Sequence, residues 1–215
     1  MDREQRHDRP HVVVHVAVSV DGAIDGFDPD VGRYYELASS WEEDVTLAGA
    51  DTILAQEPAL AGAPRPGPAA DGPLLAVVDG RRRVSEWEAL RECGHWSDVL
   101  ALRGDEGPGD EAVRVLSTGG ERVDLRVALR ALYEQEEARV VRVDSGGSLN
   151  GALLMAGLVD ELSLLVHPCF AGEAGTRRWH GNASGPPRQL EPVAAERLED
   201  GLLWLRYRIR GAAPG

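Results

Sequence analysis

The feature that most constrains this chain is an apolar strand that runs into a pair of glycines and then into a helix, all within residues 139–172. The segment VVRV at residues 140–143 is short and rich in β-branched side chains, which is typical of a buried strand. The tetrapeptide DSGG at residues 144–147 ends that strand. An apolar face with helical spacing then runs over residues 148–157, and residues 162–167 predict a second strand.

A helix that starts at a glycine pair suits a ligand that carries phosphate. Gly146 and Gly147 let the backbone approach a bound group closely, and the first amides of the helix have no partner within it. Such helix starts favour phosphate, which would meet the amides around Ser148 and Leu149. The alternative is a tight connection between strand and helix in which Ser148 serves only as the N-cap.

Composition excludes several other classes of protein. The net charge is −13 and every basic residue is an arginine, so a groove for nucleic acid is not expected. No apolar run reaches the ~18 residues of a membrane span, and residues 1–10 are too polar for a signal peptide, so we expect a cytoplasmic protein. With Cys93 and Cys169 as its only cysteines, the chain can form neither a zinc ribbon nor a disulfide framework, and no metal is expected.

A second motif lies at the C-terminal end of the first predicted strand, residues 11–20. Residues 11–20, HVVVHVAVSV, form a nearly continuous apolar run, which is typical of a central strand buried on both faces. His15 within it is expected to be a hydrogen-bonded core residue, with a catalytic role as the minor alternative. The strand ends in SVDGAI, where Asp21 and Gly22 have the chemistry of a turn.

Together the two motifs resemble the reductase domain of riboflavin biosynthesis, a relative of dihydrofolate reductase. The string DSGGSLNGALLMAGLVDEL at residues 144–162 is similar to the glycine-rich turn, helix and next strand of that family. The string S-x-D-G-x-I at residues 19–24 is similar to its loop that lines the nicotinamide and the substrate. The resemblance implies one dihydrofolate-reductase-like α/β domain over residues 10–211, after a disordered tail at residues 1–9. Its sheet would be mixed and mostly parallel, flanked by helices, with a C-terminal antiparallel hairpin.

The resemblance also implies an NADPH-dependent reductase of a pyrimidine or pterin-like molecule, most simply 5-amino-6-(5-phosphoribosylamino)uracil reductase. Asp21 and Asp144 would be catalytic, orienting an amine or sugar hydroxyl or moving a proton. The arginines after Asp79 suit the 2′-phosphate of the cofactor. A homodimer with a small-molecule substrate, and with no nucleic-acid or membrane partner, is implied as well. Cofactor contacts are expected from Ser19, Gly22, Asp79, Arg81, Arg82, Gly146, Gly147, Ser148 and Leu149.

Three departures from the family pattern leave other functions open. Asp144 and Ser145 replace the usual glutamate and glycine, and Ala23 replaces a basic residue. Residues 55–60, AQEPAL, lack the Gly-x-x-Thr turn that binds cofactor phosphate, and Glu57 would repel a phosphate there. A diverged relative with a specialised-metabolite or dihydrofolate-like substrate, or a non-catalytic binding protein, is therefore the alternative.

The rest of the chain predicts alternating helices and strands. Arg177 and Arg178 beside Trp179 could hold a phosphate or a flat heterocycle, or could lie in an ordinary exposed loop. Asp200-Gly201 favours a two-residue hairpin turn. The expected helices are residues 34–50, 86–93 and 125–136, and the other expected strands are residues 50–54, 74–78, 98–102, 113–116, 189–198 and 202–210.

Overall fold

The structure is a computed structural model that describes residues 8–105, 107, 112–184 and 189–209. Its residues group into two compact units. The first unit contains Glu43–Val141 and the chain up to Pro10, and the second contains His11–Glu42 and Arg142–Gly215. None of the helices in the described ranges is long and apolar enough to cross a membrane.

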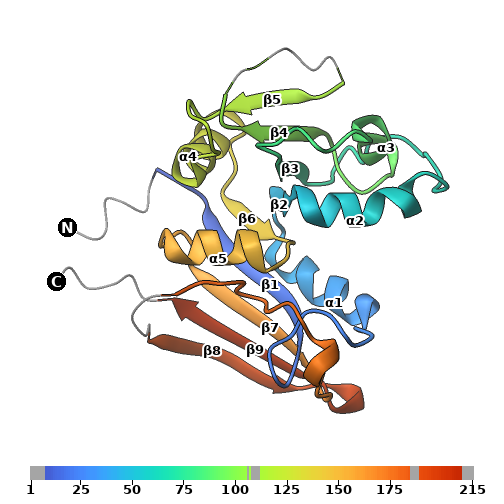
Figure 1. The fold of residues 1–215 in the computed structure, drawn as a ribbon, viewed down its shortest axis with the longest axis vertical. Coiled ribbons are helices and arrows are strands. Elements are labelled where there is room, and N and C mark those ends of the chain that lie inside the picture. The colour runs from blue at the N-terminus through green and yellow to red at the C-terminus, as the bar shows by residue number, and fades with distance from the viewer. Residues whose placement is uncertain (1–7, 106, 108–111, 185–188, 210–215) are drawn as a thin grey trace. The chain divides into compact units, whose positions relative to one another are not determined.

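Strands and helices alternate along most of the chain (Figure 1). The strands are β1 (His11–Ser19), β2 (Val45–Gly49), β3 (Leu74–Val78), β4 (Val99–Arg103), β5 (Arg114–Ser117), β6 (Val140–Val143), β7 (Glu161–His167), β8 (Leu190–Arg197) and β9 (Leu203–Ile209). The helices are α1 (Val31–Ala38), α2 (Ala50–Leu60), α3 (Trp87–Glu92), α4 (Leu125–Gln135) and α5 (Gly147–Met155), with short 3-10 turns η2 (Ser39–Trp41), η3 (Gly172–Ala174) and η4 (Glu199–Gly201).

The strands follow the order β5-β4-β3-β2-β6-β1-β7-β9-β8 in the described part of the chain. Strands β2 to β5 pair in parallel, as do β1 and β7, whereas β9 is antiparallel to both β7 and β8. The predicted mixed, mostly parallel sheet with a C-terminal antiparallel hairpin is confirmed. The first strand is interior, as its continuous apolar sequence indicated.

The second unit is built on the parallel pair β1 and β7. Their register runs from Val13 opposite Glu161 to Ser19 opposite His167, so the two strands end at the same level. Val13 is fully buried, and its neighbours on both sides in β1 are buried too. A strand covered on both faces needs apolar side chains at every position, which explains why this sequence shows no alternation.

In the first unit four parallel strands pack against α2 and α3. Ile53 of α2 and Trp87 and Leu90 of α3 belong to one apolar cluster with Leu75 and Val77 of β3. All five side chains are almost completely buried. Burial of large aliphatic and aromatic side chains at this density is the main stabilising contribution to such a layer.

The predicted helix over residues 34–50 is wrong in its second half. Helix α1 ends at Ala38, Glu42 takes a left-handed backbone conformation with φ of 45°, and Val45–Gly49 is strand β2. Four of the five residues of β2 are buried, so its side chains do not alternate between apolar and polar. A short apolar run of this kind cannot be distinguished from a buried helix segment by periodicity alone.

The predicted strand over residues 50–54 is also wrong, because α2 begins there. Gly49 is its N-cap, and the helix continues through the AQEPAL segment with Pro58 inside it. The hairpin turn differs as well: residues 198–202 connect β8 and β9 and contain the 3-10 turn Glu199–Gly201, in which both Asp200 and Gly201 have positive φ. Every other predicted element is found within two residues of its expected bounds.

Candidate active site

Two loops leave the matched ends of β1 and β7 and pair with each other. We call them loop A (residues 20–26) and loop B (residues 168–181). The amide of Ile24 donates to the carbonyl of Arg177 at 2.9 Å, and Ala23 and Arg178 form an antiparallel bridge. Ligands of open α/β sheets bind beyond the carboxyl ends of the strands, which is where these loops lie.

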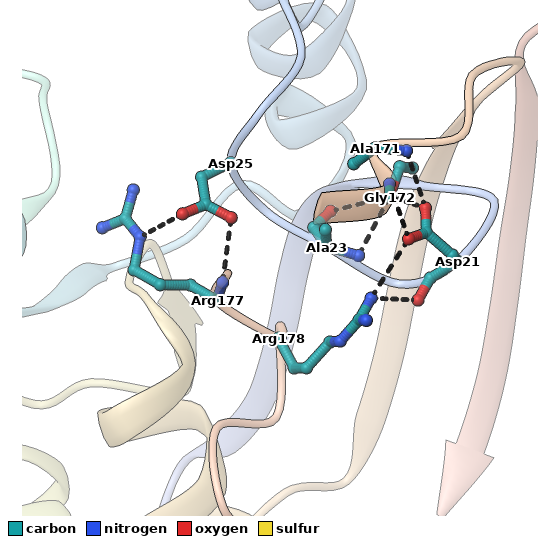
Figure 2. A network of polar contacts seen from close by, with 8 residues as sticks. Asp21, Ala23, Asp25, Ala171, Gly172, Arg177 and Arg178 are labelled. Carbon is teal, nitrogen blue, oxygen red and sulfur yellow. Dashed lines mark hydrogen bonds and ion pairs between the residues drawn. The ribbon is translucent and has the colours of Figure 1, made fainter. Parts of the chain in front are cut away.

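Asp21 in loop A is surrounded by hydrogen-bond donors. Its carboxylate accepts from the Ser19 hydroxyl at 2.8 Å, the Ala171 amide at 3.0 Å and the Gly172 amide at 3.3 Å. Arg178 donates to the backbone carbonyl and to the carboxylate of Asp21 (Figure 2). These bonds, that from Ala171 foremost, lower the pKa of Asp21 to about 2, so it remains ionised at neutral pH.

Asp25, at the far end of loop A, makes a second clamp on loop B. It accepts from the Thr176 hydroxyl at 2.8 Å. It also accepts from the Arg177 amide at 2.9 Å and from the Arg177 Nε at 3.1 Å (Figure 2). The Arg177 amide is the main reason that the pKa of Asp25 falls to about 2. The paired arginines predicted from the sequence thus each contact an aspartate of loop A.

Helix α5 starts in contact with loop B. Gly146 is the N-cap in an extended conformation without a side-chain cap, so the alternative in which Ser148 is the N-cap is wrong. A Cβ on Gly147 would overlap the carbonyl oxygen of Arg178 and the amide of Gly181, whereas a Cβ on Gly146 would meet only Ile24, at 3.7 Å. Gly147 therefore lets loop B pack on the helix, and Gly146 leaves space at the helix start.

Asn150 ties the glycine turn to loop B, and no sequence pattern singled it out. The side chain is fully buried, and its Nδ2 donates to the carbonyls of Ser145 at 3.1 Å and Trp179 at 2.9 Å. Its Oδ1 is buried without a hydrogen-bond partner among the described residues. Both bonds reach backbone atoms, so Asn150 fixes where the two segments lie relative to α5.

Asp144, at the end of β6, lies among three donors. The Tyr34 hydroxyl approaches Oδ1 at 3.3 Å, while the Tyr35 hydroxyl at 3.4 Å and Arg142 Nη1 at 3.3 Å approach Oδ2. Arg142 is buried, so the charge of Asp144 has a desolvated cation beside it. The carboxylate is consequently ordered and partly exposed next to the start of α5.

His15 is a hydrogen-bonded core residue, as predicted. Trp204 Nε1 donates to the Ser163 hydroxyl, which leaves that hydroxyl to donate to His15 Nδ1 at 2.9 Å. His15 Nε2 then donates to the carbonyl of Tyr34 at 3.0 Å. Burial lowers the pKa of His15 to about 4, so the ring is neutral and supports α1 instead of carrying a proton at neutral pH.

The turn after β3 lies in the first unit and holds the predicted arginines. Asp79 is buried, and its carboxylate accepts from the amides of Arg83 at 2.9 Å and Val84 at 3.1 Å, so it shapes the turn. Arg82 pairs with Asp105 at 2.9 Å. Arg81 is exposed on the same turn.

Two carboxylates of α2 contact the segment that follows β3. Arg83 pairs with Asp51 at 2.7 Å. Glu57, expected to repel phosphate from a loop, instead lies in α2, where its carboxylate accepts from the Ser85 amide at 3.2 Å.

The second unit therefore brings together most of the predicted site. Ser19 is buried, where its hydroxyl accepts from the Ala23 amide, and Gly22 has a φ of 78° that permits the turn of loop A. Leu149 is buried and Ser148 is exposed at the start of α5. Sequence reasoning missed Tyr34, Tyr35 and Asn150, because no local pattern marks residues whose partners lie far along the chain.

Comparison with known proteins gives the class of protein that has this fold and site: its relatives are oxidoreductases of riboflavin biosynthesis. Residues 10–204 match the RibD C-terminal domain, and the chain belongs to that family, the reductases of riboflavin biosynthesis.

Two curated archaeal relatives are named 2,5-diamino-6-ribosylamino-4(3H)-pyrimidinone 5′-phosphate reductase. The Archaeoglobus fulgidus protein is 31% identical over 76% of this chain and 83% of its own length. The Methanothermobacter thermautotrophicus protein is 26% identical over 79% of this chain and 82% of its own length. Each is similar to this chain over most of its length.

Among solved structures, a Thermotoga maritima protein has the same fold. It is described as a diaminohydroxyphosphoribosylaminopyrimidine deaminase and 5-amino-6-(5-phosphoribosylamino)uracil reductase. The similarity covers 94% of this chain and 57% of that one, with a TM-score of 0.69 and 20% sequence identity.

Proposed function

We propose that this protein is an NADPH-dependent reductase of a phosphoribosylamino-pyrimidine in riboflavin biosynthesis. The observation that carries the proposal is the open start of α5 beside an ordered carboxylate, Asp144, in a chain that belongs to a family of such reductases. A cytoplasmic location, expected from the sequence, is part of the proposal.

The start of α5 fits the pyrophosphate of a dinucleotide. The amides of Gly147, Ser148 and Leu149 have no acceptor within the helix, and Gly146 adds no side chain in front of them. Gly147 itself is covered by loop B, so the contacts would come from the exposed Ser148 more than from the glycine pair. NADPH, when bound, supplies the hydride.

The residues of this chain would then position the groups that react, while the charged side chains among them keep their charges. Asp21 keeps its charge and holds loop B through three donors, Ala171, Gly172 and Arg178, so we assign it a positioning role instead of proton transfer. Asp144 remains partly exposed and would orient an amine or hydroxyl of the substrate. Ser19 and Gly22 would shape loop A along the nicotinamide.

Arg81 is the proposed contact for the 2′-phosphate. Arg82 and Arg83 on the same turn already form ion pairs, with Asp105 and Asp51. Arg81 has no ion pair to any described residue and is exposed. An arginine that keeps all its donors can bind a phosphate in a bidentate manner.

Calorimetric titration with NADPH and NADH tests the cofactor proposal. The protein should bind NADPH more tightly than NADH, and Arg81→Ala should weaken NADPH binding about 10- to 100-fold, the value of a charged hydrogen bond, without changing NADH binding. Arg83→Ala is the matched control and should leave both affinities unchanged. Absence of binding heat at millimolar NADPH would end the cofactor proposal.

We further propose that the protein is a homodimer. Strand β8 is the last strand in the described sheet, and its Leu190 and Val193 side chains are exposed. An open apolar edge strand needs a partner or a cover. A second copy of this chain would provide one.

A further inference from the structure

We infer that Trp179 in loop B is a binding residue whose indole ring stacks on a planar heterocycle of the ligand. The inference rests on the proposed function and adds a contact to it, because the nicotinamide ring and the pyrimidine ring are both planar heterocycles. The sequence left two ligands open for the segment that contains Trp179, a phosphate or a flat heterocycle. The contacts of its side chains favour the heterocycle.

A phosphate is disfavoured because both arginines of this segment are already paired with carboxylates. Arg177 Nε lies 3.1 Å from the carboxylate of Asp25, and Arg178 Nη1 lies 3.4 Å from that of Asp21. Hydrogen bonds lower the pKa of each aspartate to about 2, so both are ionised at neutral pH. A phosphate at these arginines would therefore also meet two negative charges, which leaves the flat heterocycle as the favoured ligand.

The main chain around Trp179 docks on one face of α5. Gly147, Asn150 and Gly151 share this face, because residues three and four positions apart in a helix lie side by side. A Cβ on either glycine would overlap a carbonyl oxygen of residues 178–180. Between the two glycines, the Trp179 carbonyl accepts from Asn150 Nδ2 at 2.9 Å. This segment is thus attached to α5 through its backbone, which leaves its side chains for other contacts.

The side chains of this segment reach loop A, which is proposed to lie along the nicotinamide. The guanidinium of Arg178 binds Asp21 (Figure 2). The indole of Trp179 lies beside the turn at Gly22, where a Cβ would be 3.8 Å from its Cδ1. The Trp179 amide also donates to the Gly22 carbonyl at 3.4 Å. The backbone of Trp179 is therefore held from two sides, by loop A and by α5, with the ring next to loop A.

The indole of Trp179 is half-buried, and no group of the described residues stacks on it. The ring of His180 is its one aromatic neighbour within the described ranges, nearly perpendicular at 83° with the ring centroids 5.2 Å apart. Two other tryptophans are used differently, since Trp41 and Trp204 contact each other and both contact Arg206. The indole of Trp179 therefore keeps a flat surface for a ligand.

A tryptophan held in this way is suited to recognise a flat ring. Its side chain has only two rotatable bonds, so a large contact area is gained for little loss of conformational entropy. Stacking accepts any planar heterocycle, because the contact is made with the face of the ring. The Asn150 and Gly22 contacts fix the backbone that carries the indole, and an ordered support of this kind is what a specific contact requires.

The test measures the affinity of three probes, namely reduced nicotinamide mononucleotide, 5,6-diaminouracil and ribose 5-phosphate. The first two carry the candidate rings and the third has no aromatic ring. Trp179→Ala should weaken binding of at least one ring probe about 10- to 100-fold, the size of a lost stacking contact, and leave ribose 5-phosphate unchanged. Trp179→Phe, which keeps a flat ring, should restore most of the affinity. The ring probe that is affected identifies the stacked ring.

Phe170→Ala, at a residue of the same loop that is 78% exposed, is the matched control and should change no affinity. The affected ring probe should also quench tryptophan fluorescence in the wild type and much less in Trp179→Phe, although the other tryptophans remain.

Unchanged affinity for both ring probes in Trp179→Ala, with folding checked by circular dichroism, would overturn the inference and leave the reductase proposal intact. An equal loss for ribose 5-phosphate would also overturn it, because loop B as a whole would then be disturbed. Conversely, diaminouracil binding that depends on Trp179 in a protein that does not bind NADPH supports the inference, and the reductase proposal alone fails.

Discussion

At the scale of one residue, the carboxylate of Asp21 has a structural role, although it lies next to the proposed ligand site. Its carboxylate accepts from Ser19, Ala171, Gly172 and Arg178, which fills the capacity of its two oxygens. A group that accepts this many hydrogen bonds binds a proton poorly. Asp144 has fewer donors and more freedom, so the two aspartates expected to act alike have different environments.

Replacing Asp21 by Asn should therefore loosen loop B without altering proton transfer. Because its pKa is lowered, the Asp21 carboxylate stabilises the fold at pH values above 3.8, the ordinary pKa of the group. This stabilisation is lost as the pH falls toward about 2. Thermal unfolding should show a lower Tm for Asp21→Asn at pH 7, with the difference from wild type shrinking below pH 4.

The kinetics of the same Asp21→Asn variant distinguish a positioning role of Asp21 from a role in proton transfer. Asp21→Asn should raise KM several-fold while the pH dependence of kcat above pH 5 keeps its shape. A displaced acidic limb in that profile would show that Asp21 carries the proton after all. Asp25→Asn, which releases the other end of loop B, is the companion variant.

At the scale of elements, α5 depends on two adjacent glycines that serve different purposes. Gly147 faces Arg178 and Gly181 of loop B with no room for a side chain, whereas a Cβ on Gly146 would only reach ordinary contact with Ile24. Asn150, one turn into the helix, holds the same loop through the Trp179 carbonyl. The helix start is thus tightly packed at Gly147 and less tightly packed at Gly146.

Alanine substitutions at the two glycines should separate these purposes. Gly147→Ala must displace loop B and should destabilise the protein by about 1–3 kcal/mol, the usual cost of overpacking. Gly146→Ala should leave stability within about 0.5 kcal/mol of wild type and weaken NADPH binding instead. Denaturant unfolding and calorimetry on both variants measure the two effects. Equal stability losses would contradict the assignment.

At the scale of the whole molecule, the exposed edge strand should determine assembly. Val193 of β8 is 43% exposed, and a lysine there would protect the edge. Light scattering should give a dimer mass for the wild type and a monomer mass for Val193→Lys. Val127→Lys, at a comparably exposed position on α4, should remain dimeric. A monomeric wild-type protein at micromolar concentration would refute the dimer.

The fold class and most elements were predictable from the sequence, because runs of β-branched residues mark buried strands and glycines mark the turns that end them. The prediction of elements is wrong between residues 34 and 54. Strand β2 lies there, and because it is buried on both faces its apolar and polar residues do not alternate, so its sequence also fits a buried helix. The motif at residues 144–147 singled out Asp144 and Gly146, whose roles in the site stay predictions. Tyr34 and Tyr35 were not singled out, because they meet Asp144 across about 110 positions of the chain.

The bond between Asp21 and the Ala171 amide spans 150 positions of sequence, and β1 pairs with β7 over a similar separation. During synthesis from the N-terminus, loop A is made early and must wait for most of the chain before its partner exists. Contacts of such long range close late, because chain entropy opposes them until much of the fold is in place. The proposed ligand site is therefore among the last parts of the second unit to form, and a nascent chain that stops before loop B has both β1 and Asp21 but lacks this site.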